Sequence, residues 1–231
     1  MSGTGHRFCV LMPAYREGKK IREVLRRILK HCRDTVVIDD GSDDGTAEEA
    51  EKTGATVLRH RVNRGKGAAL ATGFEYAGKG NFEFVIVMDA DGQHDPDDIP
   101  VFIRAFDRGA GPVIAGNRMG NTENMPLVRR MTNRFMSGLL SGKMGQRVPD
   151  TQCGYRLYAA EVLELIPADS GRFAAESEVL LRLADAGVKI NSVPVKVIYG
   201  SEKSKINPLR DTFRFFAMLR RYGRGRGREK S

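Results

Sequence analysis

The sequence contains no tryptophan, few cysteines and no long apolar run. A membrane-spanning helix needs about 20 predominantly apolar residues, and the first apolar run covers only residues 8–12. The polar residues before it do not form the pattern of a secretory signal peptide. We therefore expect a protein that does not cross a membrane, although it could lie on the surface of one.

Cysteine is represented only by Cys9, Cys32 and Cys153, an odd number with no close pair. Close pairs are typical of zinc sites, and an even set in a short secreted chain is typical of a disulfide framework. The pattern therefore predicts three reduced thiols in a cytoplasmic protein.

Acidic residues are absent from one stretch and scarce in another, while the chain as a whole has a net charge of +9. Residues 125–149 contain five Lys or Arg and no acid, and residues 210–231 contain eight Lys or Arg against two acids. Such patches attract the phosphate groups of nucleotides, nucleic acids or lipids.

Short apolar runs alternate with helical patterns in the first half of the chain. Five runs typical of buried strands cover residues 8–12, 35–39, 55–58, 84–88 and 113–116. Helical patterns lie between them, at residues 21–32, from Thr46 with a capping-box Glu49, at 66–77 and at 97–108. This alternation predicts an α/β fold with a mostly parallel, Rossmann-like sheet and helices on both faces.

The second half of the chain is less regular. We predict helices at 126–144, 176–186 and 209–222, a loop and short strand at 151–158, and a strand at 191–199. The first of these helices groups six apolar residues on one side: Leu127, Val128, Met131, Phe135, Leu139 and Leu140. We divide the chain into a main domain, 1–207, and a basic amphipathic helix with a disordered Arg/Gly tail, 208–231.

Three polar clusters follow predicted strands, at residues 13–17, 39–42 and 89–91. The carboxyl ends of parallel strands meet at one edge of the sheet, where ligands bind. We therefore expect the three clusters to form one site.

The most informative cluster is Asp89-Ala90-Asp91. Two carboxylates two residues apart can converge on one hard cation if the chain turns at Gly92, and Mg²⁺ or Mn²⁺ prefers such oxygen ligands. Gln93 and His94 could add a ligand or a supporting contact. The alternative is an acidic loop or helix cap.

Two further motifs suit a nucleotide. Asp39 or Asp40 could accept a hydrogen bond from a base, while Thr46 could serve only to cap a helix. The segment 63–67 places two glycines and two cations before a helix, where backbone N–H groups and Lys66 suit phosphate. A solvated turn is the alternative for this segment.

Five motifs occur in the order seen in family 2 glycosyltransferases of the GT-A fold, which the chain resembles: Pro13-Ala14-Tyr15-x-Glu17, Asp39-Asp40-Gly41-Ser42-x-Asp44-Gly45-Thr46, Asn63-x-Gly65-Lys66-Gly67, Asp89-Ala90-Asp91-Gly92-Gln93-His94 and Gly116-Asn117-Arg118. Two later motifs resemble the branch of dolichyl- and polyprenyl-phosphate sugar synthases: Asp150-Thr151-Gln152-Cys153-Gly154-Tyr155-Arg156 and Gly200-x-x-x-Ser204-Lys205. The resemblance covers roughly residues 8–206 and implies that 1–207 is a catalytic domain.

The resemblance also implies individual roles. The base and ribose would be held by Pro13, Ala14, Tyr15 and Glu17. Asp39 would read the base edge, and Asp40 would also belong to the nucleotide-binding residues. The nucleotide would be lined by Lys66, Asp89 and Ala90. The metal, Mg²⁺ or Mn²⁺, would be held by Asp89, Asp91 and Gln93. The catalytic residues would be Arg118 and Lys205, which steady phosphate charge, and Asp150, near the acceptor.

The expected reaction is an inverting sugar transfer from a UDP- or GDP-linked donor. Metal and cations would stabilise the diphosphate charge that develops. A hydroxyl acceptor would need a base, with Asp150 first and Glu176 or Glu178 behind it. A phosphate acceptor would need positioning instead, to which Arg129, Arg130 and Arg134 could contribute unless they form a solvated basic face.

Alternatives remain open for the acceptor and the C-terminal segment. We expect a lipid phosphate or another lipid as acceptor, an anionic membrane surface as partner, and a location in the cytoplasm or on the cytoplasmic membrane face. A soluble acceptor and a non-catalytic nucleotide- or nucleic-acid-binding module are the alternatives. Residues 209–222 could lie on lipid, pack on their own domain, or bind RNA with the tail. Nucleic acid and an obligate protein partner are not expected.

Overall fold

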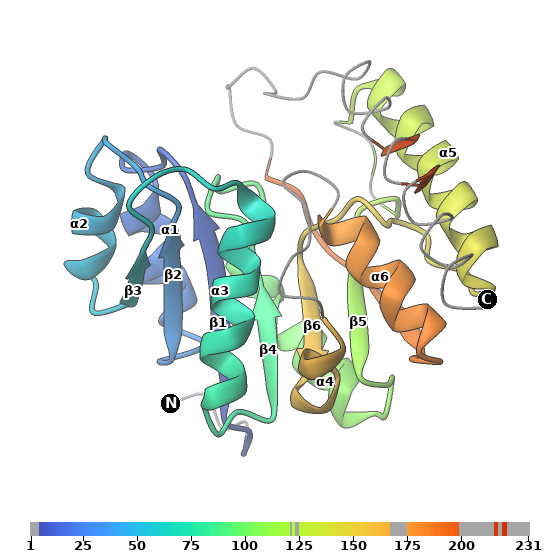
Figure 1. Cartoon of the computed structure of the whole chain (residues 1–231), viewed down its shortest axis with the longest axis horizontal. Coiled ribbons are helices and arrows are strands. Elements are labelled where there is room, and N and C mark those ends of the chain that lie inside the picture. The colour runs from blue at the N-terminus through green and yellow to red at the C-terminus, as the bar shows by residue number, and fades with distance from the viewer. Residues whose placement is uncertain are drawn as a thin grey trace.

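The computed structural model describes residues 5–120, 122, 125–166, 175–198, 215–216 and 219–220. Its centre is a seven-stranded sheet with the order β3-β2-β1-β4-β6-β5-β7 (Figure 1). The strands are β1 (Phe8–Ala14), β2 (Thr35–Asp39), β3 (Thr56–Arg59), β4 (Phe84–Val87), β5 (Val113–Asn117), β6 (Arg156–Ala159) and β7 (Ile190–Pro194). The helices are α1 (Ile21–Ile28), α2 (Thr46–Glu51), α3 (Lys66–Lys79), η1 (Pro96–Asp98), α4 (Ile99–Asp107), α5 (Leu127–Met144), η2 (Ala160–Leu165) and α6 (Ala175–Asp185).

The sheet is parallel except at β6. Strand β1 pairs in parallel with β2 and β4, β2 with β3, and β5 with β7. Strand β6 is antiparallel to both β4 and β5. Strands β4 and β5 therefore run in the same direction, and their carboxyl ends lie at the same edge as that of β1. The predicted mostly parallel sheet is confirmed.

Helices cover both faces, as the sequence pattern predicts, because the central strands are apolar on both sides. Val10 and Met12 of β1 pack with α1 and α4 on one face. Cys9 and Leu11 point to the other face and pack with α3, α6 and η2. Figure 1 shows α3 and α6 in front of the sheet. All three cysteines are free and buried, and burial raises the pKa values of Cys32 and Cys153 to about 12.

The start of α2 differs from the predicted capping box. The N-cap is Gly45, whose φ of 82° is left-handed, and Thr46 is the first helical residue. The Thr46 hydroxyl accepts a hydrogen bond from the backbone N–H of Glu17 at 2.9 Å and donates one to Asp44 at 2.5 Å. Thr46 therefore ties the segment after β1 to α2 and does not cap the helix.

Helix α5 has the predicted extent, but most of its predicted apolar side is not the buried side. Met136 and Leu140 point inward and form a cluster with Leu181, Phe215 and Leu219. The other apolar residues on that side are exposed: Leu127, Val128, Met131, Phe135 and Leu139. No helix within the described ranges has the length and apolar character needed to cross a bilayer.

The C-terminal predictions lie largely outside the described residues. Phe215, Phe216, Leu219 and Arg220 are helical, and Phe215 and Leu219 are buried. The domain boundary at 207, the Arg/Gly tail and Lys205 fall outside the described ranges.

Candidate functional site

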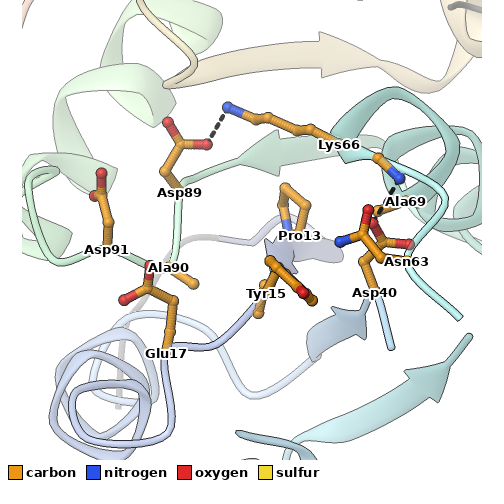
Figure 2. A pocket seen from close by; sticks show the side chains of 12 residues that line it. Pro13, Tyr15, Glu17, Asp40, Asn63, Lys66, Ala69, Asp89, Ala90 and Asp91 are labelled. Atoms are coloured by element: carbon orange, nitrogen blue, oxygen red, sulfur yellow. Dashed lines mark hydrogen bonds and ion pairs between the residues drawn. The ribbon is translucent and has the colours of Figure 1, made fainter. Parts of the chain in front are cut away.

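A pocket of about 440 Å³ opens at the carboxyl edge of the sheet. It is lined by the end of β1, the segments that follow β1, β2, β3 and β4, and the start of α3: Pro13, Ala14, Tyr15, Glu17, Asp40, Asn63, Gly65, Lys66, Ala69, Asp89, Ala90 and Asp91. Figure 2 shows Asp89 and Asp91 along one side, Asp40 and Asn63 along the other, and Tyr15 between them. The structure thus brings the three predicted polar clusters into one site.

Asp40 holds the glycine-containing loop in place. Its carboxylate accepts hydrogen bonds from the backbone N–H groups of Arg64 at 2.9 Å and Gly65 at 2.7 Å. The His60 ring lies between Asp40, at 2.7 Å, and the Thr72 hydroxyl, at 3.0 Å. Gly65 has a φ of 93°, a conformation that a side chain would disfavour. Asp40 thereby shapes the pocket wall, although it also lines the pocket.

Asp39 is fully buried and does not line the pocket. One of its oxygens, Oδ1, accepts a hydrogen bond from the Ser42 N–H at 3.3 Å. The other, Oδ2, lies 3.4 Å from Arg59 Nε and has no hydrogen-bond partner among the described residues. A buried acceptor left without a hydrogen bond is costly, and the nearby Arg59 guanidinium offsets part of this cost.

Lys66, the first residue of α3, reaches across to two carboxylates. Its Nζ contacts Asp89 Oδ1, just after β4, and Glu176 Oε1, near the start of α6. Burial alone would lower the pKa of Lys66, but the two carboxylates outweigh it and raise that pKa. Burial would likewise raise the pKa of Asp89, but the positive groups around it, Lys66 foremost, together lower that pKa to about 2, so Asp89 stays ionised.

Gly154 lies directly against this ion cluster. A Cβ built at Gly154 would lie 2.9 Å from Asp89 Oδ2, 2.9 Å from Glu176 Oε1 and 3.2 Å from Lys66 Nζ. The backbone at Gly154, before β6, therefore lies so close to the charged groups that a side chain at this position would displace them.

Two local contacts fix the Asp89–Asp91 turn. The Asp89 N–H donates to His94 Nδ1 at 3.2 Å, and the His94 ring stacks on Tyr155 with centroids 5.1 Å apart. Burial lowers the pKa of His94, which favours the neutral ring that can accept this hydrogen bond. Asp91 Oδ1 accepts from the Gln93 N–H at 2.9 Å. Gln93 therefore supports Asp91 through its backbone and is not a lining residue.

The site offers a divalent cation two carboxylates, Asp89 and Asp91. Within the described part of the chain, no group of three or more His, Cys, Asp or Glu residues comes together to hold a metal. Two carboxylates suit Mg²⁺ or Mn²⁺, because Mg²⁺ in particular usually takes one or two protein carboxylates and fills its other positions with phosphate oxygens and water. The ammonium of Lys66 already lies against Asp89, which shows that this position favours positive charge. The residues present therefore fit such an ion when a diphosphate accompanies it.

Arg118 and Asp150 form a buried pair and are not among the lining residues. Arg118 donates through Nε at 2.7 Å and through a terminal nitrogen at 2.9 Å, and its backbone N–H adds a third bond at 3.1 Å. Burial alone would lower the pKa of Arg118, but its hydrogen bonds to Asp150 and the neighbouring negative groups together raise it. The positive charge of Arg118 also contributes to the lowered pKa of Asp89, so the pair lies close to the site.

Some features of the site were not predicted. Ala69 lines the pocket one turn after Lys66, and the spacing of three residues along the helix was the available signal. Glu176 was considered only as a reserve base, whereas the structure pairs it with Lys66. Nothing in the local sequence indicates that pairing, because α6 and α3 are more than 90 residues apart.

Comparison with known proteins assigns the chain to a family. A family model described as "Glycosyl transferase family 2" matches residues 9–166. The chain belongs to this family. Since a curated relative is also named as an N-acetylglucosaminyltransferase, this family 2 protein is a glycosyltransferase.

Relatives and solved structures agree with this assignment. An uncharacterised protein of Methanocaldococcus jannaschii, MJ1222, is 37% identical, with 82% of this chain and 81% of that protein covered. A UDP-N-acetylglucosamine–dolichyl-phosphate N-acetylglucosaminyltransferase of Methanococcus voltae is 30% identical, with 82% and 85% covered. A Mycobacterium tuberculosis glucosyl-3-phosphoglycerate synthase, solved with Mn²⁺, UDP and phosphoglyceric acid, shares the fold, with a TM-score of 0.69, 21% identity and coverage of 87% and 73%.

Proposed function

We propose that this family 2 glycosyltransferase uses Mg²⁺ or Mn²⁺ to bind a UDP- or GDP-sugar and transfers the sugar, with inversion, to a polyprenyl phosphate at the cytoplasmic face of a membrane. One observation carries the proposal. A single pocket joins the 13–17 segment and Asp40 at one end to the Asp89 and Asp91 carboxylates at the other. The Methanococcus voltae relative, named for a dolichyl-phosphate acceptor, supports the acceptor class.

The base would lie at the end of the pocket formed after β1 and β2. Tyr15, which is 40% exposed, presents a ring to the pocket and could stack on a base. Asp39 Oδ2, which lies 3.4 Å from Arg59 Nε and has no hydrogen-bond partner among the described residues, would accept a hydrogen bond from the base edge. Glu17, which lies between Tyr15 and Asp91 in Figure 2, would lie near the ribose.

The diphosphate would lie at the other end. Asp89 and Asp91 would hold the cation, which would stabilise the negative charge that develops when the sugar–diphosphate bond breaks. Lys66 would exchange part of its contact with Asp89 for phosphate oxygens, and its position at the first residue of α3 adds the helix N-terminus. Arg118, whose positive charge contributes to the lowered pKa of Asp89, would stabilise the same developing charge.

Asp150 would act through Arg118. Because both Asp150 oxygens are engaged by Arg118, we propose a positioning role for Asp150 and not the removal of a proton from the acceptor. A phosphate monoester is already anionic and loses its second proton with a pKa of about 6, so as an acceptor it needs positioning more than deprotonation. Lys205, which lies outside the described residues, stays a proposed phosphate-binding cation.

A thermal-shift panel tests the donor site. We expect UDP- or GDP-sugars to raise the melting temperature only with Mn²⁺ or Mg²⁺, because a ligand stabilises the state that it binds. Asp91→Asn should abolish the metal-dependent shift, whereas Asp34→Asn, at an exposed loop before β2, should keep it. A shift that persists without metal, or in Asp91→Asn, would contradict the proposal.

The acceptor is tested separately. The Mycobacterium tuberculosis structure holds phosphoglyceric acid, so a soluble acid phosphate is the second candidate. Incubation with the preferred donor should label a polyprenyl phosphate in vesicles and leave phosphoglycerate unlabelled. The reverse result would assign a soluble acceptor and leave the donor site unaffected.

A further inference from the structure

Helix α5 carries an exposed apolar surface that the proposed reaction does not use. We call it the outer face; it consists of Leu127, Val128, Met131, Phe135 and Leu139. Leu127 is 60% exposed, Val128 and Met131 63%, and Phe135 57%. Four of these residues are spaced four apart, so they form a continuous ridge along the helix. Single exposed apolar residues are common, but a contiguous ridge indicates an interaction surface.

The outer face lies opposite the face that attaches α5 to the protein. Asn133, Met136, Ser137 and Leu140 are the buried residues of α5. At 3.6 residues per turn, these four positions fall roughly on the opposite side of the helix from the ridge. The helix therefore packs on α6 and on Phe215 and Leu219 with one side, and its other side is exposed.

The charges around the outer face favour an anionic partner. Arg134 borders the ridge on one side and Lys143 on the other, and both are exposed. Residues 125–149 contain no acid. In a symmetric contact between two copies of the chain, the same basic residues would face each other. A surface of anionic lipid instead offers apolar tails to the ridge and phosphates to its basic borders.

The position of α5 fits the same partner. It follows β5, whose carboxyl end lies at the same edge of the sheet as those of β1 and β4, where the pocket opens. Figure 1 shows α5 extending beyond this end of the sheet. A bilayer on the outer face would thus lie beside the site.

We propose that the outer face of α5 is a lipid-docking surface, which lies in the headgroup region of an anionic bilayer with Arg134 and Lys143 on lipid phosphates. The proposal rests on the proposed function only for its biological purpose, which is to bring the site to an acceptor in the membrane. The docking itself requires neither donor nor acceptor.

Vesicle co-sedimentation of the full-length protein tests it. The wild type should bind mixed phosphatidylcholine–phosphatidylglycerol vesicles, and salt should weaken the binding. Met131→Ser with Phe135→Ser should reduce the affinity at least about tenfold, since each change removes an apolar side chain from the lipid. Leu165→Ser, at an exposed leucine of η2, is the matched control and should bind like the wild type.

The basic residues at the borders of the outer face provide a second test. Arg134→Glu should weaken binding to the anionic vesicles several-fold, whereas Arg108→Glu, at an exposed position after α4, should have little effect. Unchanged binding of the Met131/Phe135 double variant would overturn the proposal, because it would place lipid binding elsewhere on the chain. Absence of wild-type binding, or a wild-type dimer that the double variant converts to monomer, would also overturn it. Metal-dependent donor binding is measured without vesicles, so failure here leaves the donor site untouched.

Discussion

Gly154 shows how one residue limits what the site can hold. Its missing side chain leaves room for Asp89, Glu176 and Lys66 to meet beside the backbone. The groups that a Cβ would meet are the ends of flexible side chains, which can move aside. The fold can therefore accept a larger residue, but the charged cluster cannot keep its arrangement.

We expect Gly154→Ala to fold and to lose at least about tenfold in kcat/KM, because displaced carboxylates would no longer bind the cation in the same place. Steady-state transfer assays and thermal unfolding measure the two effects. Gly78→Ala, at an exposed position in α3 with nothing near its Cβ, is the control. It should keep its activity and gain up to about 1 kcal/mol of stability, since alanine favours a helix more than glycine does. Equal activity of both variants would contradict the crowding argument.

Substitution of Asp150 distinguishes a role in positioning Arg118 from a role as the general base. Asp150→Asn leaves the Arg118 guanidinium buried without its carboxylate, which should cost about 3 kcal/mol in the free energy of unfolding. Arg118→Met combined with Asp150→Asn should recover part of that loss, because no unpaired charge remains. Urea unfolding measures both. An Asp150→Asn variant of full stability but without activity would instead support a base.

At the scale of elements, His6 links the segment before β1 to the start of β4 and to the end of α4. The His6 ring lies 2.8 Å from the Glu83 carboxylate, next to β4, and 2.6 Å from Asp107, the last residue of α4. It also packs edge-on against Phe84 with centroids 5.5 Å apart. Hydrogen bonds to Glu83 and Asp107 raise the pKa of His6 above its usual 6.5.

This raised pKa predicts a pH dependence. The folded protein holds the His6 proton more tightly than the unfolded chain, so the stabilisation is complete below about pH 6.5 and is lost as pH rises through the folded pKa. His6→Gln should therefore be less stable than the wild type at pH 6 by up to about 1 kcal/mol, because the pair is partly exposed. The difference should shrink towards pH 9. Urea midpoints across this range measure it, and a difference that grows with pH would refute it.

The periodicity of the sequence predicted the elements that depend on local pattern. It did not predict arrangements that depend on contacts between segments far apart in the sequence. The alternation of apolar runs gave β1 to β5 within a few residues, because most of these strands are buried, and buried parallel strands must be apolar on both faces. It could not place β6 between β4 and β5, since that antiparallel position depends on partners far away in sequence. It likewise grouped five apolar residues of α5 that share the exposed side, but it wrongly placed the buried Leu140 with them and could not tell which side meets the protein.

The candidate site also has features that the sequence predicts and features that it does not. The clusters at residues 13–17 and 89–91 were predictable, because the carboxyl ends of parallel strands share an edge. The contact of Asp150 with Arg118, and that of Glu176 with Lys66, depends on how the second half of the chain returns to the first. Asp40 shows a third case, where one carboxylate lines the pocket and also holds the loop.

For the whole molecule, Lys66 links the two halves of the chain. It belongs to α3, and its partners come from the end of β4 and from α6. Without a metal, its ammonium neutralises two carboxylates that would otherwise repel each other. A divalent cation at Asp89 and Asp91 would compete with the same ammonium for Asp89, so metal binding and the stability of the free protein should be coupled through Lys66.

Lys66→Met makes this coupling measurable. The metal-free variant should be less stable than the wild type by about 1–3 kcal/mol, because Asp89 and Glu176 lose their hydrogen-bonding cation. Mn²⁺ alone should then raise its melting temperature more than that of the wild type, because the ion no longer competes with an ammonium for Asp89. Lys79→Met removes another lysine of α3, whose pair with Glu75 is exposed, and should change neither quantity appreciably. Sugar transfer should still fall at least about tenfold in Lys66→Met, since the diphosphate loses a cation. A Mn²⁺ shift equal in the wild type and Lys66→Met would mean that the ion does not bind at Asp89.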